Sequence, residues 1–308
     1  MQGIAHNRVS YIPFYAAVFT NLSREHLDFH KTMQHYFNTK EKLFEQTSGD
    51  CIVNVSDRYG KKLYQMLKEQ NKDVFSFGFD QSCDYALSGV KTAATGTSFT
   101  LKTPDWKRRF AVPLIGACNA VNCGLAAALA AREGFGPQEL EPCMKKLRCV
   151  PGRLELIYSG TPKVYLDYAH TPEAIRNAIE TLKGITTGRL ITLFGCGGER
   201  DHLKRSEMGK IATSLSDHVV ITNDNPRSEP PNRIISQIVK GCEKQNYTVV
   251  PDRALAVEHA LSMAGENDFV LLAGKGHEEY QIFGEEEIPF SERECVKKYF
   301  LNRNQYNL

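Results

Sequence analysis

Four groups of polar residues in the second half of the sequence have the composition of a binding site. Each group combines carboxylates, cations or glycines, and each comes directly after a short apolar run. Carboxylates, imidazoles and guanidinium groups bind ions and transfer protons, and glycines let backbone amides approach a phosphate. The groups lie at 167–170 (DYAH), 195–205 (GCGGERDHLKR), 224–227 (DNPR) and 274–278 (GKGHE).

Each group also has an ordinary structural explanation. Asp167 could cap a helix, with His170 on the surface before a proline. The glycines of FGCGG could form turns, Asn225-Pro226 is a common turn dipeptide, and Lys275 could be a solvated loop residue. A shared site becomes the better explanation only if the elements of the fold bring the four groups together.

The elements around these groups predict an α/β domain. Apolar runs at 164–167, 190–195, 219–222, 247–250 and 269–273 alternate with helical segments. Five buried strands separated by helices indicate a Rossmann-like domain with a mostly parallel sheet. Ligands bind such domains at the carboxyl ends of the strands, where all four polar groups are expected.

The first half of the sequence has a different pattern. Aromatic residues at 36–44 have helical spacing, and strands at 51–55 and 74–79 enclose an amphipathic helix at 58–70, which makes a βαβ unit. Short alternating segments over 85–114 predict antiparallel strands, and helices are expected at 117–132 and 137–147. Val150-Pro151-Gly152 is the best boundary, giving domains 1–150 and 151–308.

Composition narrows the class of protein. The 308 residues are 42% hydrophobic with a net charge of +2, so nothing indicates a nucleic-acid partner. The nine cysteines form no C-x-x-C pair, which favours reduced, mostly buried thiols. No apolar run could span a bilayer, and we find no signal peptide. These features predict a cytoplasmic protein without membrane insertion.

The motifs, in this order and spacing, resemble a known family. DYAHTPEA, FGCGGERDHLKR, DNPRSEPP and AGKGHEEYQ are similar to the C-terminal domain of the Mur ligases, most of all to the members that add meso-2,6-diaminopimelate. FTNLSREHLDFH and NTKEKLF resemble the central domain of the same family. The resemblance implies a partial central, ATP-binding domain over 1–150 and an amino-acid-binding domain over 151–308.

The resemblance implies a ligase of peptidoglycan precursor synthesis. ATP phosphorylates a carboxylate of UDP-N-acetylmuramoyl-L-alanyl-D-glutamate, and an amine of meso-diaminopimelate attacks the resulting acyl phosphate. Phosphoryl transfer needs Mg²⁺ and positive charge around the phosphates. The second step needs the amine held in line with the acyl carbon.

Lys40 and His26 are the catalytic and metal-site candidates that the resemblance implies. Lys40 matches a lysine that carbon dioxide converts to a carbamate, a carboxylate suited to Mg²⁺. His26 matches a residue near the same ion. Without the resemblance, Lys40 is a solvated helix lysine. His26 and His30 could form half a zinc site, but no HExxH motif completes it.

The resemblance also assigns a nucleotide side of the site. Asn119 and Asn122 lie on a helix, where they could simply form its polar face. The full set of implied nucleotide-binding residues is Asn119, Asn122, Arg153, Asp167 and His170.

Arg227 carries the prediction of the amino-acid substrate. Diaminopimelate differs from lysine by a second, distal carboxylate, which the planar guanidinium of arginine binds in bidentate geometry. Lysine would leave a buried arginine unpaired, so such a site should reject it. The resemblance places Glu278 against the distal ammonium. The implied substrate-binding residues are Arg8, Arg205, Asp224, Asn225, Pro226, Arg227, Gly274 and Glu278.

One motif of the family is missing from the 308 residues. The sequence contains no G-x-x-x-x-G-K-[ST] phosphate loop, and the family's domain for the uridine nucleotide has no counterpart. Without a phosphate loop the β- and γ-phosphates of ATP lack their cradle. We therefore expect the chain on its own to be inactive or nearly so.

Two other functions stay open. A folylpolyglutamate-synthetase-like ligase would share the fold and the lysine chemistry, although DNPR and GKGHE are against it. A non-catalytic amino-acid-binding module is the alternative outside the enzymes. Binding of diaminopimelate without ATP turnover would favour that module.

Overall fold

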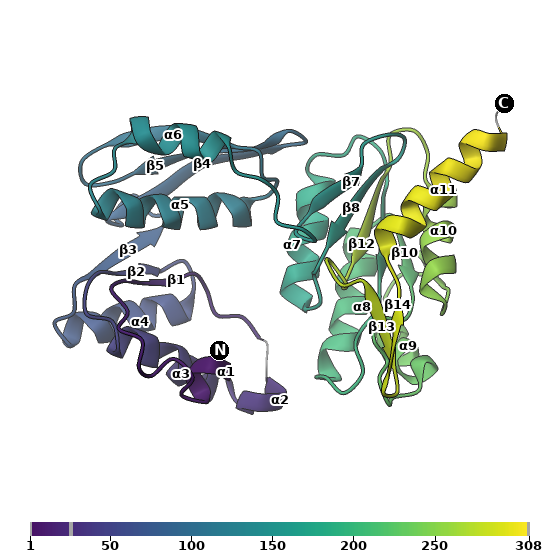
Figure 1. Ribbon diagram of the computed structural model, residues 1–308, viewed down its shortest axis with the longest axis horizontal. Helices are drawn as coiled ribbons and strands as arrows, with labels where there is room; N and C mark the ends of the chain where they lie inside the picture. The colour runs from purple at the N-terminus through teal and green to yellow at the C-terminus, as the bar shows by residue number, and fades with distance from the viewer. Residues whose placement is uncertain (1, 25–26, 307–308) are drawn as a thin grey trace. The chain divides into compact units, whose positions relative to one another are not determined.

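The computed structural model describes residues 2–24 and 27–306, which divide into two compact units, Met1–Arg148 and Cys149–Leu308. Both units are α/β with mostly parallel sheets, as the sequence predicts (Figure 1). Each has its own hydrophobic core, so each is described by itself.

Unit 1 is built on a six-stranded sheet of order β1-β2-β3-β4-β5-β6. The pairs from β1 to β4 are parallel, and β4, β5 and β6 pair antiparallel, which confirms the βαβ unit and the antiparallel segment. The sequence reasoning missed β1, which has only three residues. The strands are β1 (Ala17–Phe19), β2 (Cys51–Asn54), β3 (Val74–Gly78), β4 (Tyr85–Ala93), β5 (Gly96–Lys102) and β6 (Lys107–Val112).

The helices of unit 1 begin at recognisable capping residues. Thr32 accepts the His35 N–H and begins α3, and Asp57 accepts the amides of Tyr59 and Gly60 to begin α4. Ala120 and Ala128 of α5 are buried on the sheet, where their small side chains let the helix pack closely. The helices are α1 (Gln2–Ala5), α2 (Leu27–His30), α3 (Met33–Glu45), α4 (Arg58–Glu69), α5 (Ala117–Arg132) and α6 (Pro137–Lys145).

Unit 2 has a six-stranded sheet of order β11-β10-β9-β12-β8-β7, in which only β7 is antiparallel. The five predicted strands are all present, and β8, β9, β10 and β12 are buried as expected for parallel strands, whereas the edge strand β11 is partly exposed. The sequence reasoning missed the edge strand β7 and the hairpin β13–β14. The strands are β7 (Glu155–Tyr158), β8 (Lys163–Asp167), β9 (Leu190–Phe194), β10 (His218–Ile221), β11 (Tyr247–Val249), β12 (Phe269–Ala273), β13 (Tyr280–Phe283) and β14 (Glu286–Pro289).

Helices cover both faces of this sheet (Figure 1). α7, α8 and α9 pack in a row on one face, and α10 and α11 pack together on the other. The chain changes faces between β11 and β12, which returns to the middle of the sheet. The helices are α7 (Pro172–Lys183), α8 (Leu203–Leu215), α9 (Pro231–Val239), α10 (Arg253–Met263) and α11 (Glu292–Tyr306).

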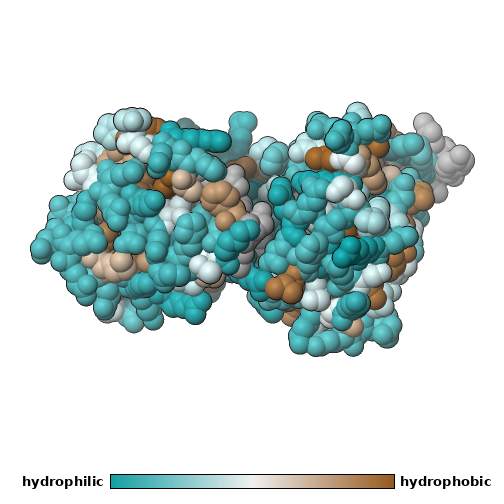
Figure 2. Space-filling view, turned by 90° about the horizontal axis from the view of Figure 1, so that it is seen from below, coloured by the Kyte–Doolittle hydropathy of each residue, from teal (hydrophilic) through white to brown (hydrophobic). Residues whose placement is uncertain are grey.

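The surface and the cysteines agree only in part with the sequence expectations. Hydrophilic residues dominate the face in Figure 2, with small separate apolar patches. None of the helices described is both long and apolar enough to cross a membrane. All nine cysteines are free thiols, as expected. Only four are buried, however, because Cys118, Cys143 and Cys149 lie at the surface of helices and of the segment between the units.

Candidate functional site

The four polar groups meet at one edge of the unit 2 sheet. Strand register sets Ala273, the last residue of β12, opposite both Asp167 of β8 and Phe194 of β9. Ile221 ends β10 opposite Phe194. The residues that follow these strand ends therefore occupy a single rim. The gathering expected from the sequence is confirmed.

A cation and an aromatic ring stand beside the end of β8. The Arg153 guanidinium lies 5.0 Å from the centroid of the Tyr168 ring, whose centroid is 4.7 Å from that of His170. His170 Nδ1 lies 2.8 Å from the Tyr168 carbonyl oxygen. Three of the predicted nucleotide-side residues, Arg153, Asp167 and His170, thus lie near the carboxyl end of β8.

Asp167 is the buried carboxylate of this group. Its Oδ2 accepts the N–H of Leu154 at 2.7 Å. Burial raises the pKa of Asp167 from its ordinary value, while the amides of Leu154 and Ala169 oppose that rise. The carboxylate is therefore held in a fixed position at some cost to its charged form.

The segment 224–227 is held tightly against the neighbouring loops. Asp224 and Asn225 are buried, and Asp224 Oδ1 accepts the backbone N–H of Asn225 at 2.7 Å. A Cβ on Gly198 would lie 1.9 Å from the Pro226 carbonyl oxygen, so only glycine fits there. This contact explains one glycine of FGCGG and fixes the position of Pro226.

Arg227 differs from the other arginines of the rim. It has a φ of 53°, and its backbone pairs with the β13 hairpin through an N–H bond to the Ile282 carbonyl at 3.0 Å. Its half-buried guanidinium donates to the carbonyls of Gly198 at 2.9 Å and Asn225 at 3.4 Å. Within residues 2–24 and 27–306, no carboxylate forms an ion pair with Arg227.

Arg205 is fully buried, unlike a ligand-contacting arginine open to solvent. Its two terminal nitrogens each donate to a Glu229 oxygen at 2.9 Å, in bidentate geometry. Gln237 and the Gly197 carbonyl accept its other bonds. The hydrogen bonds from Arg205 lower the pKa of Glu229 to about 2. Arg205 thus holds the loop after β9, and a direct substrate contact stays a prediction.

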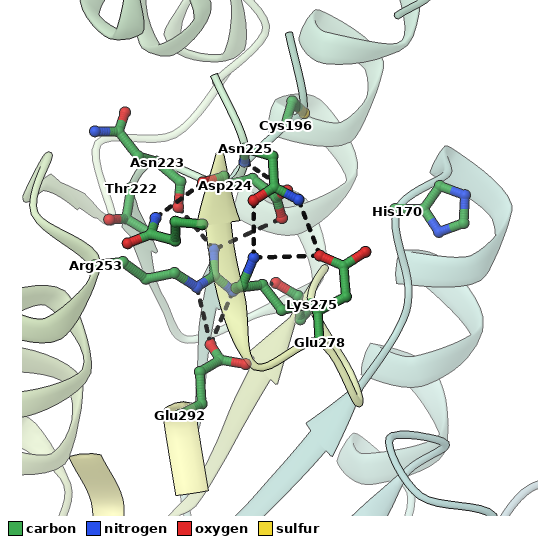
Figure 3. A network of polar contacts seen from close by, with 12 residues as sticks. His170, Cys196, Thr222, Asn223, Asp224, Asn225, Arg253, Lys275, Glu278 and Glu292 are labelled. Atoms are coloured by element: carbon green, nitrogen blue, oxygen red, sulfur yellow. Dashed lines mark hydrogen bonds and ion pairs between the residues drawn. The ribbon is translucent and has the colours of Figure 1, made fainter. Parts of the chain in front are cut away.

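The loop after β12 brings a buried cation beside a carboxylate. Lys275 has no exposed side-chain surface, and its Nζ lies 3.2 Å from Glu278 Oε2 and 3.0 Å from Asn225 Oδ1 (Figure 3). Gly274 has a φ of 114°, and a Cβ there would lie 2.8 Å from Asp224 Oδ2. The positive φ therefore favours glycine at 274, where the loop passes close to the Asp224 carboxylate.

Arg253 is a part of this network that sequence reasoning missed. The guanidinium is buried and donates to Glu292 Oε1 at 2.8 and 3.0 Å (Figure 3). It also donates to the carbonyls of Asn223 at 2.8 Å and Ala273 at 2.9 Å. The residue therefore ties the ends of β10 and β12 to the start of α11. No local pattern in PDRALAV marks it, because its partner lies 39 residues later in the chain.

In unit 1, Lys40 lies near the carboxyl end of β1. Its Nζ donates to the Asn21 carbonyl at 2.8 Å and lies 5.3 Å from the Phe19 ring centroid and 5.6 Å from that of Tyr36. The role that the resemblance implies for Lys40 stays a prediction. His26, its predicted neighbour, lies outside the described residues.

The other unit 1 candidates are less closely held. Asn119 and Asn122 lie in the first turns of α5, three residues apart, and Asn119 Nδ2 donates to the Ile115 carbonyl at 2.9 Å. Arg8 is exposed just after α1. Their predicted roles toward nucleotide and substrate stay predictions.

The residues fit Mg²⁺ only with a ligand that the sequence does not encode directly. The described part of the chain contains no cluster of three histidine, cysteine or acidic side chains able to hold a metal ion. Mg²⁺ keeps several waters and needs only one or two protein carboxylates together with substrate phosphates. A carbamate on Lys40 would supply such a carboxylate.

Two protein-family models match the chain, one for each unit. The Mur ligase middle domain matches residues 1–131, and the Mur ligase, glutamate ligase domain matches residues 152–276. The chain therefore belongs to the Mur ligase family.

Curated relatives lie within the branch that the motifs indicate. The chain is 39% identical over 296 residues to UDP-N-acetylmuramoyl-L-alanyl-D-glutamate--2,6-diaminopimelate ligase 1 of Clostridium acetobutylicum, covering 95% of this chain and 61% of the relative. It is 38% identical over 295 residues to the corresponding ligase of Clostridium tetani, covering 95% and 60%. The chain thus spans about three fifths of the length of these relatives.

Solved structures agree on the fold. A UDP-N-acetylmuramoyl-L-alanyl-D-glutamate--2,6-diaminopimelate ligase matches with a TM-score of 0.64 and 29% identity, over 98% of this chain and 63% of that one. The Mycobacterium tuberculosis folylpolyglutamate synthase matches with a TM-score of 0.72 and 18% identity, over 86% and 62%. The second likeness concerns the fold alone.

Proposed function

We propose that this chain forms two domains of an ATP-dependent ligase that adds meso-2,6-diaminopimelate to UDP-N-acetylmuramoyl-L-alanyl-D-glutamate. The product is a cytoplasmic peptidoglycan precursor. The names of the relatives supply the reaction, and the rim of unit 2 supplies the reason for this amino acid.

Arg227 is the observation that carries the proposal. The two fully buried arginines of the rim already have carboxylate partners, because Arg205 pairs with Glu229 and Arg253 pairs with Glu292. Arg227 has only carbonyl partners in the described structure. A half-buried guanidinium without a carboxylate is suited to bind one from a ligand. The distal carboxylate, which lysine lacks, is that ligand group.

The nucleotide would lie against the end of β8 in this proposal. Arg153 and Tyr168 offer a cationic and an aromatic face, and Asp167 offers a carboxylate held by backbone amides. These side chains would orient ATP rather than react with it. Phosphoryl transfer depends mostly on positioning and charge, so side chains that only orient ATP can still contribute to the rate.

In unit 1, Lys40 as a carbamate would help to hold Mg²⁺. When bound, the ion neutralises charge that develops on the transferred phosphoryl group. The Asn21 carbonyl and the rings of Phe19 and Tyr36 hold the end of the Lys40 side chain at this position. His26 belongs to the same proposal.

The carbamate can be tested without an activity assay. In a solution of ¹³C-bicarbonate, the chain should give a carbonyl NMR signal of a protein carbamate that is absent from Lys40→Ala. Lys42→Ala, which removes a lysine two residues away on the same helix, is the control and should keep the signal. A spectrum that does not change in Lys40→Ala would refute this part of the proposal.

Because the chain spans about three fifths of the relatives, the ligation is best tested in a hybrid of their full length. We would join the N-terminal two fifths of the Clostridium acetobutylicum ligase to this chain and measure ATP-dependent ligation. The hybrid should ligate diaminopimelate and reject lysine, with the intact Clostridium enzyme as positive control. A folded hybrid that hydrolyses ATP but uses lysine equally well would overturn the substrate assignment.

The two alternatives predict different results. A folylpolyglutamate-synthetase-like ligase would extend a folate with glutamate and would ignore diaminopimelate. A binding module would bind diaminopimelate but give a hybrid without ligation.

A further inference from the structure

Lys275 is a buried lysine that the reaction does not obviously need. Its side chain is fully buried between β12 and β13, and its Nζ lies 5.6 Å from the Tyr280 ring centroid. Lysine is almost never fully buried unless it is paired, because desolvation of the ammonium is costly. Within the described residues, its one ion pair is with Glu278, at 3.2 Å. A buried cation at this position needs a reason beyond packing.

The buried Lys275 fixes the orientation of the Asn225 side chain. Its Oδ1 accepts two hydrogen bonds, from Lys275 Nζ at 3.0 Å and from the Ile282 N–H at 3.1 Å (Figure 3). Because both partners are donors, the amide must point its Nδ2 the other way. That nitrogen donates to Glu278 Oε2 at 2.9 Å. The Asn225 Oδ1 is therefore occupied by donors of the protein, and its Nδ2 binds Glu278.

The two carboxylate oxygens of Glu278 differ in the donors that they accept. Oε2 receives both strong donors, Lys275 Nζ and Asn225 Nδ2. Oε1 has a single long contact, with the Tyr168 hydroxyl at 3.4 Å. The side chain is 15% exposed, so this carboxylate still reaches the surface of the rim. Oε1 is therefore the oxygen with capacity for a ligand, and its direction is set by what holds Oε2.

We propose that Lys275 is a specificity-determining positioning residue, which fixes Asn225 and Glu278 so that Glu278 Oε1 receives the distal ammonium of the amino-acid substrate. This inference rests on the proposed function. A carboxylate held in place before binding loses less conformational freedom when the ammonium arrives. Arg227 then binds the distal carboxylate of the ligand. Lys275 acts on the distal ammonium indirectly, by positioning Glu278.

Two ligand analogues separate these roles. 2-Aminopimelate has both carboxylates of diaminopimelate but only one amino group, and lysine has both amino groups but one carboxylate. We would measure the affinity of the 308-residue chain for all three ligands by calorimetry. The wild type should prefer diaminopimelate over each analogue.

Lys275→Met should lower the affinity for diaminopimelate about tenfold, because it removes a hydrogen bond between charged groups that holds Glu278 in place. Its affinity for 2-aminopimelate should change less than about twofold on the same reasoning, because that ligand never used the Glu278 contact. The preference over lysine should persist. Arg227→Ala should show the reverse pattern, losing the preference over lysine and keeping the preference over 2-aminopimelate.

Matched variants control for damage to the fold. Lys183→Met removes a lysine that pairs with Asp217 at the opposite end of β9, and it should leave all three affinities unchanged. Lys275→Arg keeps the positive charge and should restore part of the preference. If Lys275→Met does not fold, Asn225→Asp replaces the Nδ2 donor to Glu278 by an acceptor and should weaken the same preference.

The outcomes distinguish this inference from the proposed function. Equal losses for diaminopimelate and 2-aminopimelate in a folded Lys275→Met would make Lys275 merely structural and overturn the inference. An unchanged preference in Lys275→Met or in Asn225→Asp would also overturn it. A wild type that does not prefer diaminopimelate over lysine would instead count against the proposed function.

Discussion

The carboxylate of Asp167 illustrates how a single residue carries both structure and chemistry. Folding moves it from water to the end of β8, where two backbone amides, those of Leu154 and Ala169, donate to it. Burial nevertheless has the larger effect and raises the pKa of Asp167. A residue that is held in this way at a cost to its charged form is typical of a functional site.

Asp167→Asn tests this balance. An acid whose folded pKa is raised contributes stability below its ordinary pKa of 3.8 and loses that contribution as the pH rises through the folded value. Asn does not ionise, so the variant should not lose stability as the pH rises. At pH 7 its free energy of unfolding should be at least that of the wild type. Urea unfolding from pH 3.5 to 7 measures it. If the wild type gains stability over this range relative to the variant, the direction of the shift is wrong.

The sequence predicted the residues of the site better than their contacts. Asp167, Asp224, Arg227 and Glu278 follow strand ends, and that position alone places them on the rim. The resemblance implies that Arg205 contacts the substrate, which stays a prediction, but the sequence did not indicate that Arg205 also pairs with Glu229. Pairing across 24 residues depends on how two loops fold against each other, which local patterns do not contain.

At the scale of elements, one buried ion pair joins the segments that carry the site. Arg253 begins α10, and its guanidinium reaches the carbonyls at the ends of β10 and β12 together with Glu292 of α11. These strand ends lead directly into 224–227 and 274–278. The pair thus sets the spacing of two loops that have no backbone ladder between them.

Arg253→Met should destabilise unit 2 by about 3 to 5 kcal/mol, because it leaves Glu292 buried without its cation. Arg253→Met combined with Glu292→Leu should be more stable than the single variant, since neither charge is then buried alone. Denaturant unfolding measures both. Arg108→Met, which removes an exposed pair with Glu141, is the matched control and should change stability by less than about 1 kcal/mol. Equal effects at Arg253 and Arg108 would contradict the account.

Elements with strong patterns were also the ones that the sequence predicted well. The helix expected at 117–132 is α5, and the five buried strands of unit 2 all form. The missed elements, β7 and the hairpin β13–β14, are partly or fully exposed and contain charged residues. Such strands are specified by their partners rather than by their own hydrophobicity.

At the scale of the whole molecule, the chain is two units with separate cores. The segment at 145–151, which leads from α6 to β7, is exposed almost throughout and contains Lys146 and Arg148. Domains with their own cores can in principle fold alone, and exposed segments between them are preferred sites of proteolysis. Composition and the Val150-Pro151-Gly152 turn are enough to predict this division, because it depends on where apolar patterns stop.

Limited trypsin treatment should therefore cut first at Lys146 or Arg148. Residues 149–308 made as a separate protein should fold cooperatively and bind diaminopimelate with an affinity within about threefold of the whole chain, since all the proposed ligand contacts except Arg8 lie in this unit. Calorimetry and mass spectrometry of the fragments check both statements. Loss of binding in a folded 149–308 fragment would mean that unit 1 contributes to the amino-acid site.

The proposed function depends most on Arg227, which would select a ligand with a distal carboxylate. Its most direct test is the ratio of the dissociation constants of lysine and meso-diaminopimelate, measured by calorimetry for the wild-type chain, Arg227→Ala and Arg227→Lys. The wild type should prefer diaminopimelate by about 100-fold, as expected for a charge-assisted bidentate pair, and Arg227→Ala should lose most of that preference. Arg227→Lys should fall between them, because a lysine keeps the charge without the fork. A preference that is the same in Arg227→Ala as in the wild type would contradict the central claim.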